Sequence, residues 1–303
     1  MRILKNFVRD LRRHWILCLM LLPVLAYYVI FHYGPMYGVQ IAFKDYSAGR
    51  GIMGSPWIGL SHFTDFFKGV FFWRLIRNTL MISFGMLIFG FPMPIFFALM
   101  LNEIKQMSYK RVVQTLSYLP HFISMVVMCG IIVDFTKTAG LFNDIFVFFG
   151  GERKTLLLFP EYFRPVYIIS GIWQEMGWNS IIYLAAISGV NPELYEAATV
   201  DGAGRFRKII NVTIPSIAPT IIILLILRVG NLMSVGFEKV LLLQNPSNLI
   251  TSDIISTYVY KRGLLDGNFS FSSAVGLFNS VINFMLIMFA NQVSKKVSET
   301  SLW

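Results

Sequence analysis

Residues 214–235 read IPSIAPTIIILLILRVGNLMSV, and the only charged residue in this stretch is Arg228. A helix needs roughly 20 mostly apolar residues to cross the hydrocarbon core of a bilayer, so this segment is long enough to span a membrane. Five other stretches have the same character, and we therefore predict six membrane-spanning helices. Their approximate ranges are 15–33, 78–101, 112–136, 165–189, 214–235 and 272–292.

The composition agrees with a membrane protein. Hydrophobic residues make up 55% of the chain, charged residues make up 14%, and the mean hydropathy is +0.62. These values are not typical of a soluble globular protein. We expect an all-α, polytopic membrane protein with one transmembrane domain over residues 1–303. Its fourth span is the least apolar, because Gln174, Glu175 and Asn179 interrupt it.

The N-terminus has the basic start and apolar run of a signal peptide. The run at 15–31 is long for such a signal, and no small-residue cleavage site follows it closely, so we interpret it as an uncleaved first span. Cys18 and Cys129 both lie in apolar stretches. We expect two buried thiols with no disulfide or metal role.

The distribution of Lys and Arg predicts the orientation in the bilayer. Of the 26 Lys and Arg residues, 13 fall in four short segments and 12 fall in the three longer segments on the other side. Because cytoplasmic segments carry the excess of positive charge, we expect a multi-pass protein of the cell membrane with both termini in the cytoplasm. The short segments are 1–14, 102–111, 190–213 and 293–303; the long ones are 34–77, 137–164 and 236–271.

One cytoplasmic segment, residues 191–219, reads NPELYEAATVDGAGRFRKIINVTIPSIAP. Asn191 suits the N-cap of a short helix and Pro192 its first position. Gly202 can end that helix, because glycine adopts positive φ without steric cost. A second short helix is predicted before Pro215. Two interpretations follow: a helix that docks into a groove of a cytoplasmic partner, or an amphipathic segment on the lipid surface.

The pattern Glu-Ala-Ala, then Asp-Gly-Ala, then Pro215 resembles the EAA loop of permease subunits of binding-protein-dependent ABC importers. In that family the loop docks into a separate ATPase subunit and couples its motion to the pore. The resemblance therefore implies a coupling loop at 190–213. It implies a coupling role for Glu196, Ala197, Ala198, Asp201 and Gly202.

Residues 33–46 and 173–186 resemble a branch of carbohydrate importers named for lipoprotein-linked polysaccharide transport. The resemblance implies the permease fold of type I ABC importers and alternating access. It also implies four kinds of partner: a second homologous permease subunit, two cytoplasmic ATPase subunits, an external sugar-binding lipoprotein and an oligosaccharide substrate. Acidic, pectin-type fragments are among the expected sugars. The sequence identifies neither the sugar nor whether the pore is a heterodimer or a homodimer.

Polar residues within the spans are candidates for the substrate pathway, because such groups are costly in lipid and often functional. Aromatic rings cover the C–H faces of sugars, and amides or carboxylates bond their hydroxyl groups. The alternative is hydrogen bonding between helices, which we favour for the two asparagines of the last span. For Arg228 the alternatives are an acidic ligand and an ion pair, for instance with Glu175. The candidates are Trp173, Gln174, Glu175, Trp178, Asn179, Tyr183, Arg228, Asn231, Asn279 and Asn283.

The chain lacks the residue patterns of a catalytic site. No Gly-Lys dipeptide occurs, so there is no ordinary P-loop, and we expect a partner ATPase to bind ATP and Mg²⁺. The four histidines have no metal-ligand spacing, and we find no nucleophile and base pair. Two other functions stay open: a membrane enzyme acting on lipid-linked sugars, and a sensor or scaffold of the same fold that does not transport.

Overall fold

The computed structural model describes residues 13–298 and 301–302. These residues are almost entirely helical or in turns, and their one bridge of strand type joins Lys44 to Trp57. The chain divides into two units: 1–67 with 262–277, and 68–261 with 278–303. The predicted all-α class is confirmed, and each unit is described by itself.

The first unit contains a long N-terminal helical segment, Trp15–Phe43. Its packing depends on aromatic side chains: Phe66 is buried, and its ring lies 6.3 Å from that of Phe271. The Tyr46 N–H donates to Ser270 Oγ at 2.9 Å, which ties the loop after Phe43 to the start of the last helix. The helices of this unit are α2 (Trp15–Tyr28), η1 (Val29–Tyr33), α3 (Gly34–Met36), η2 (Tyr37–Phe43), α4 (Gly51–Gly54) and α5 (Ser61–Lys68).

The second unit contains the remaining helices. Those before the long α11 are α6 (Phe72–Gly85), η3 (Met86–Gly90), α7 (Pro92–Glu103), α8 (Met107–Tyr118), η4 (Leu119–Phe122), α9 (Met125–Thr136), α10 (Leu141–Phe148) and η5 (Leu156–Leu158). They are followed by α11 (Pro160–Ser188), α12 (Pro192–Val200), α13 (Arg205–Lys208), η6 (Ile209–Thr213), α14 (Ile214–Gly230), α15 (Phe237–Leu243), α16 (Leu249–Ser252) and α17 (Ile255–Tyr260). Both η7 (Lys261–Leu265) and α18 (Phe269–Ser298) run across the boundary between the units.

Five described helical segments are long and apolar enough to cross a membrane: Trp15–Phe43, Phe72–Glu103, Met125–Phe148, Arg205–Gly230 and Phe269–Lys296. The predicted fourth span corresponds to α11, which has 29 residues but is less apolar.

The predicted third span, 112–136, is divided in the structure. Its first half belongs to α8 and η4, and a new helix begins at Met125 with Ser124 as its N-cap. Pro120 lies at this division; proline lacks the N–H that an uninterrupted α-helix requires. The candidate span in this region is Met125–Phe148, which comprises α9, ending at Thr136, and α10.

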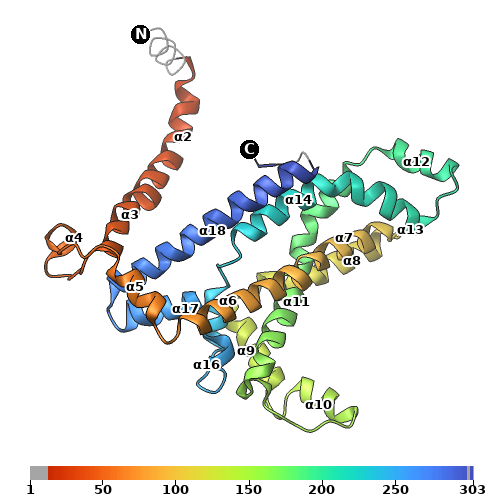
Figure 1. The fold of residues 1–303 in the computed structure, drawn as a ribbon. Coiled ribbons are helices and arrows are strands. Elements are labelled where there is room, and N and C mark those ends of the chain that lie inside the picture. Colours follow the sequence, from red (N-terminus) through yellow and green to blue (C-terminus); the bar gives the residue numbers. More distant parts are fainter. Residues whose placement is uncertain (1–12, 299–300, 303) are drawn as a thin grey trace. The chain divides into compact units, whose positions relative to one another are not determined.

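Helix α11 is the centre of the second unit and packs against α6, α7, α8 and α14 (Figure 1). Its contact with α8 is close because of Gly177. A Cβ atom at this position would overlap the backbone carbonyl oxygen of Ser117 in α8. Only glycine allows the two backbones to approach this far.

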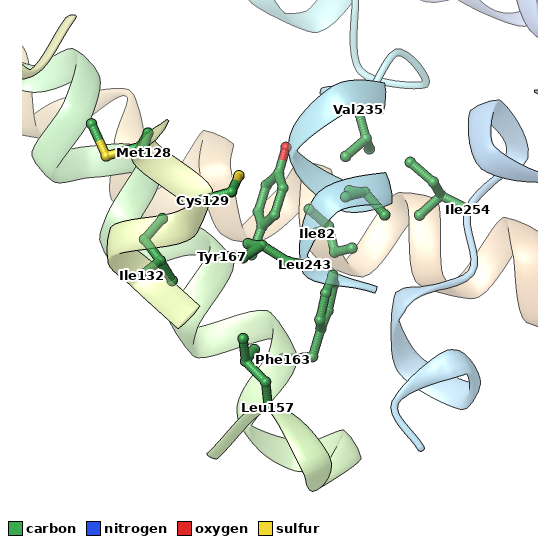
Figure 2. Packing of buried hydrophobic residues seen from close by; sticks show 11 residues of the cluster. Ile82, Met128, Cys129, Ile132, Leu157, Phe163, Tyr167, Val235, Leu243 and Ile254 are labelled. Carbon is green, nitrogen blue, oxygen red and sulfur yellow. The ribbon is translucent and has the colours of Figure 1, made fainter. Parts of the chain in front are cut away.

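Buried hydrophobic side chains from α6, α9, α11 and residues 235–254 form one cluster (Figure 2). Phe163 and Tyr167 come from α11, and Val240 and Leu243 come from α15. A second cluster joins α7, α11 and α14 through Ala98, Tyr183, Ile187 and Ile217. The two clusters place α7, α14 and α15 around the same helix.

A buried carboxylate fixes the segment that follows α15. The side chain of Asp253 is 7% exposed, and it accepts bonds from Arg74 Nη2 at 3.0 Å and Lys261 Nζ at 3.3 Å. Two cations around one carboxylate compensate for its burial. The network connects α6 to residues 253 and 261 and so holds this part of the chain beside the α11 core.

Candidate functional site

A cavity of about 600 Å³ lies within the second unit. Its wall comes from α6, η3, α7, α11 and α14, together with residues 231–239. A cavity of this size suits a small organic ligand. Its lining combines methionine and aliphatic side chains with a polar set: Ser83, Tyr167, Gln174, Glu175, Asn179, Tyr183, Arg228, Asn231, Ser234 and Lys239.

Six of the ten predicted pathway residues line this cavity: Gln174, Glu175, Asn179, Tyr183, Arg228 and Asn231. The other four do not belong to its lining. Trp173 is exposed, and Trp178 stacks on the ring of His121 with centroids 4.4 Å apart and planes 4° apart. The structure thus brings the polar residues of α11 and α14 together and turns both tryptophans of α11 elsewhere.

The two asparagines of α18 make contacts of a different kind. Asn283 accepts from the Met233 N–H at 2.9 Å and donates to Ser234 Oγ at 2.9 Å. Oδ1 of Asn279 is buried and has no hydrogen-bond partner among the described residues. Asn283 therefore joins α18 to the non-helical segment after α14, and not to a second helix.

The carboxylate on the cavity wall has a partner that the sequence analysis did not name. Glu175 lies 3.1 Å from Nδ1 of His121, which belongs to η4. Trp178 packs flat against the same imidazole, so His121 contacts two side chains of α11. Of the described residues that line the cavity, Glu175 alone carries a carboxylate.

Arg228 makes no ion pair with Glu175, so the ion-pair alternative named for it is not what the structure contains. Its side chain lies in the last turn of α14, where the negative end of the helix dipole favours a cation. It is exposed toward the cavity, and among the described residues no carboxylate lies within ion-pair distance of it.

Lys239 is a lining residue that the sequence analysis missed. It lies in α15, outside the candidate spans, so the search for polar groups within spans did not reach it. The residue is 4% exposed, and its Nζ donates to the Tyr167 carbonyl oxygen at 3.2 Å. Burial lowers the pKa of Lys239 to about 8, against the opposing influence of Cys129 and Glu175. This position belongs to the cavity wall only because the fold packs α15 on α11.

The predicted coupling loop has well-defined ends. Oδ1 of Asn191 accepts from the Glu193 N–H at 3.0 Å and caps α12. At the other end Gly202 has φ +73°, and the Ala203 N–H donates to the Ala198 carbonyl at 2.8 Å. The predicted second short helix is not separate: α13 continues through the π-helical turn η6 into α14. Pro215, which cannot donate to residue 211, is the second residue of α14, just after this wider turn.

The surface of this loop is open. Glu196, Ala197, Asp201 and Gly202 are exposed, and Ala198 is half-buried. Two apolar side chains beside them are also exposed, Val200 by 88% and Phe206 by 74%.

Comparison with known proteins gives the family. Residues 90–299 match the model of the family described as binding-protein-dependent transport system inner membrane component. The match covers more than half of the chain. The chain belongs to this family. This binding-protein-dependent permease is thus a multi-pass membrane subunit whose role is transport and not catalysis, which confirms the family predicted from the EAA pattern.

Two relatives from Bacillus subtilis (strain 168) match the permease over nearly its whole length. The polygalacturonan/rhamnogalacturonan transport system permease protein YteP is 47% identical over 288 residues, which cover 95% of this chain and 90% of YteP. Protein LplB is 46% identical over 299 residues, which cover 98% and 94%.

A solved structure is also similar. One chain of a bacterial alginate ABC transporter, in complex with an alginate pentasaccharide-bound periplasmic protein, is 44% identical to this permease. The TM-score is 0.89, and the alignment covers 97% of this chain and 99% of that one. The type I importer permease fold is therefore confirmed.

Proposed function

We propose that this permease forms one half of the pore of an ATP-driven importer of oligosaccharides, including acidic fragments of polysaccharides. The observation that carries the proposal is the cavity in which Arg228 stands beside amide and phenol side chains of α11. A guanidinium binds carboxylates, and amides bond sugar hydroxyl groups. The names of YteP and of the alginate transporter, both linked to acidic polysaccharides, support the same substrate class.

The partners in this proposal are a second homologous permease subunit, two cytoplasmic ATPase subunits that bind ATP and Mg²⁺, and an external sugar-binding protein. The termini and residues 190–213 lie on the cytoplasmic side. The exposed α12 and the turn at Gly202 dock into one ATPase, and ATP-driven closure of the ATPases moves the helices around the cavity. The cavity is thereby opened first to the outside and then to the cytoplasm, as in alternating access.

The test begins with the proteins that accompany the chain. A tagged chain, purified from native membranes in mild detergent, is expected to bring with it a second permease, an ATPase with a P-loop and a sugar-binding protein. The purified assembly in proteoliposomes is then expected to accumulate tri-galacturonate only when ATP and Mg²⁺ are supplied to the ATPases. A chain that elutes alone from several mild detergents would contradict the coupling role of residues 190–213. Sugar-dependent ATPase activity without uptake would instead favour the sensor.

A further inference from the structure

Lys239 is a buried cation on the cavity wall that no carboxylate of the described residues neutralises directly. Its ammonium has three donors, and one of them bonds the Tyr167 carbonyl oxygen at 3.2 Å. The nitrogen also lies 4.9 Å from the centroid of the Tyr167 ring. Both contacts are weaker compensation for a buried positive charge than a carboxylate would be.

The carboxylate that could serve this purpose is engaged elsewhere. Glu175 lines the same cavity and favours the charged form of Lys239 through its negative charge. However, its oxygens bond to His121 at 3.1 and 3.3 Å, and no ion pair joins it to Lys239. Among the described residues, the cavity therefore contains two cations without a bonded counter-ion, Arg228 from α14 and Lys239 from α15.

Helix α11 presents a glycine to the ammonium. A Cβ atom at Gly171 would lie 3.4 Å from Nζ of Lys239 and 3.2 Å from Cε of Met86. Gly171 lines the cavity one turn after Tyr167, whose carbonyl accepts the bond from Lys239. A side chain at 171 would therefore lie against both Met86 and the ammonium, and glycine leaves the place beside them free of side-chain atoms.

We infer that Lys239 is a specificity-determining residue that binds a carboxylate of the transported sugar. The inference rests on the proposed function and adds a residue from outside the spans to its binding site. In this arrangement Lys239 and Arg228 accept an anionic saccharide, in which each uronate unit carries one carboxylate. His121 holds Glu175, the one carboxylate of the described lining, in a hydrogen bond and so reduces its repulsion of that ligand. Transfer of the substrate requires no covalent step.

The experiment uses the complete importer in proteoliposomes, with tri-galacturonate as the probe. The variants are Lys239→Met, which removes the charge, and Lys239→Arg, which keeps it. The matched control is Lys137→Met, because that lysine lies outside the cavity, is exposed and pairs with the exposed Asp134. We expect Lys239→Met to lower the uptake rate at limiting substrate by about tenfold or more, since it removes a charge-assisted hydrogen bond. Lys239→Arg should retain most of the uptake, and Lys137→Met should resemble the wild type.

A second measurement avoids the selectivity of the external binding protein. Tri-galacturonate and its carboxyl-reduced, neutral counterpart are added to the detergent-purified importer without that protein, and the melting temperature is recorded. We expect the acidic probe to stabilise the wild type and Lys239→Arg but not Lys239→Met. The neutral probe should act equally on all three.

Two results would overturn the inference. The first is a Lys239→Met variant that takes up tri-galacturonate like the wild type. The second is a Lys239→Met variant whose basal ATPase activity and melting temperature, both measured without sugar, are lower than those of the wild type. Lys239 would then be a structural link between α15 and α11. A wild-type importer that moved only neutral oligosaccharides would overturn the inference and leave oligosaccharide import standing. A wild-type importer that moved no saccharide would overturn both the inference and the proposed function.

Discussion

At the scale of single residues, the charge state of Lys239 links the cavity to pH. The groups that face its ammonium are Tyr167 and Glu175 of α11 and Cys129 of α9. Burial lowers its pKa from 10.5 to about 8, so the folded protein loses this proton at a lower pH than the unfolded chain does. Between these two values the unfolded state binds more protons, and the stability contribution of Lys239 rises with pH. Binding of an anion changes in the opposite direction, because it requires the ammonium.

The need for a charged ammonium in anion binding gives a prediction for the pH dependence of uptake. In the wild-type importer we expect the uptake of tri-galacturonate to fall as the pH rises through about 8, since the ammonium deprotonates there. The guanidinium of Lys239→Arg stays charged over the same range, so its pH profile should be flatter. The measurement is the uptake rate between pH 6.5 and 9.5, corrected for basal ATPase activity. Identical profiles for the wild type and Lys239→Arg would assign the titration to another group.

At the scale of helices and turns, the C-terminus of α12 depends on one backbone conformation. Gly202 has φ +73°, and its N–H donates to the Thr199 carbonyl at 3.0 Å. Proline fixes φ near −65° and has no N–H, so Gly202→Pro must break this turn. We expect uptake to fall by about tenfold or more, while the assembly still forms and hydrolyses ATP.

The matched control lies two residues further along the same loop. Gly204 already has φ −67° and ψ 170°, which suits proline, so Gly204→Pro should transport nearly as well as the wild type. The measurement is the ratio of transported sugar to hydrolysed ATP. Full coupling in Gly202→Pro would contradict the docking role of residues 190–213.

The contact between α8 and α11 is the second element on which the cavity depends. Gly177 faces the Ser117 carbonyl so closely that even a methyl group requires the helices to separate. We expect Gly177→Ala to destabilise the permease by about 1–3 kcal/mol, the usual cost of overpacking, and to lower its melting temperature in detergent. Gly130→Ala in α9 is the control, because a Cβ atom there meets nothing within 4 Å. A melting temperature for Gly177→Ala equal to that of this control would show that α8 and α11 separate without cost.

At the scale of the whole molecule, the predicted orientation places residues 190–213 and 137–164 on opposite sides of the membrane. Single cysteines, introduced into a variant that carries Cys18→Ser and Cys129→Ala, can show on which side of the membrane each segment lies. Val200 is 88% exposed and the Glu152 side chain is 87% exposed, so Val200→Cys and Glu152→Cys are both accessible to label. We expect an impermeant maleimide to label Glu152→Cys in intact cells and Val200→Cys only after the membrane is opened. The reverse pattern would contradict cytoplasmic termini.

Membrane insertion and the ends of α12 could be predicted from the sequence because they depend on local properties. Hydrophobic length decides whether a segment such as 214–235 crosses a bilayer, and the cap at Asn191 and the glycine at 202 decide where α12 begins and ends. The EAA pattern lies within residues 196–215, so the family also followed from one contiguous stretch. Polar residues within predicted spans led to six lining residues for the same reason, since their cost in lipid is visible without a fold.

The tertiary structure alone decided which polar residues meet. The partner of Glu175 is 54 residues away, at His121, and the Lys239 ammonium meets the carbonyl of Tyr167 72 residues away. The spacing of residues along the sequence does not predict such pairs, because they arise from packing between helices that are distant in the chain. The same packing turned Trp173 and Trp178 away from the cavity and joined Asn283 to Ser234. The sequence therefore determined the apolar segments, apart from the division at Pro120, and the ends of α12, and the fold determined which charges meet in the cavity.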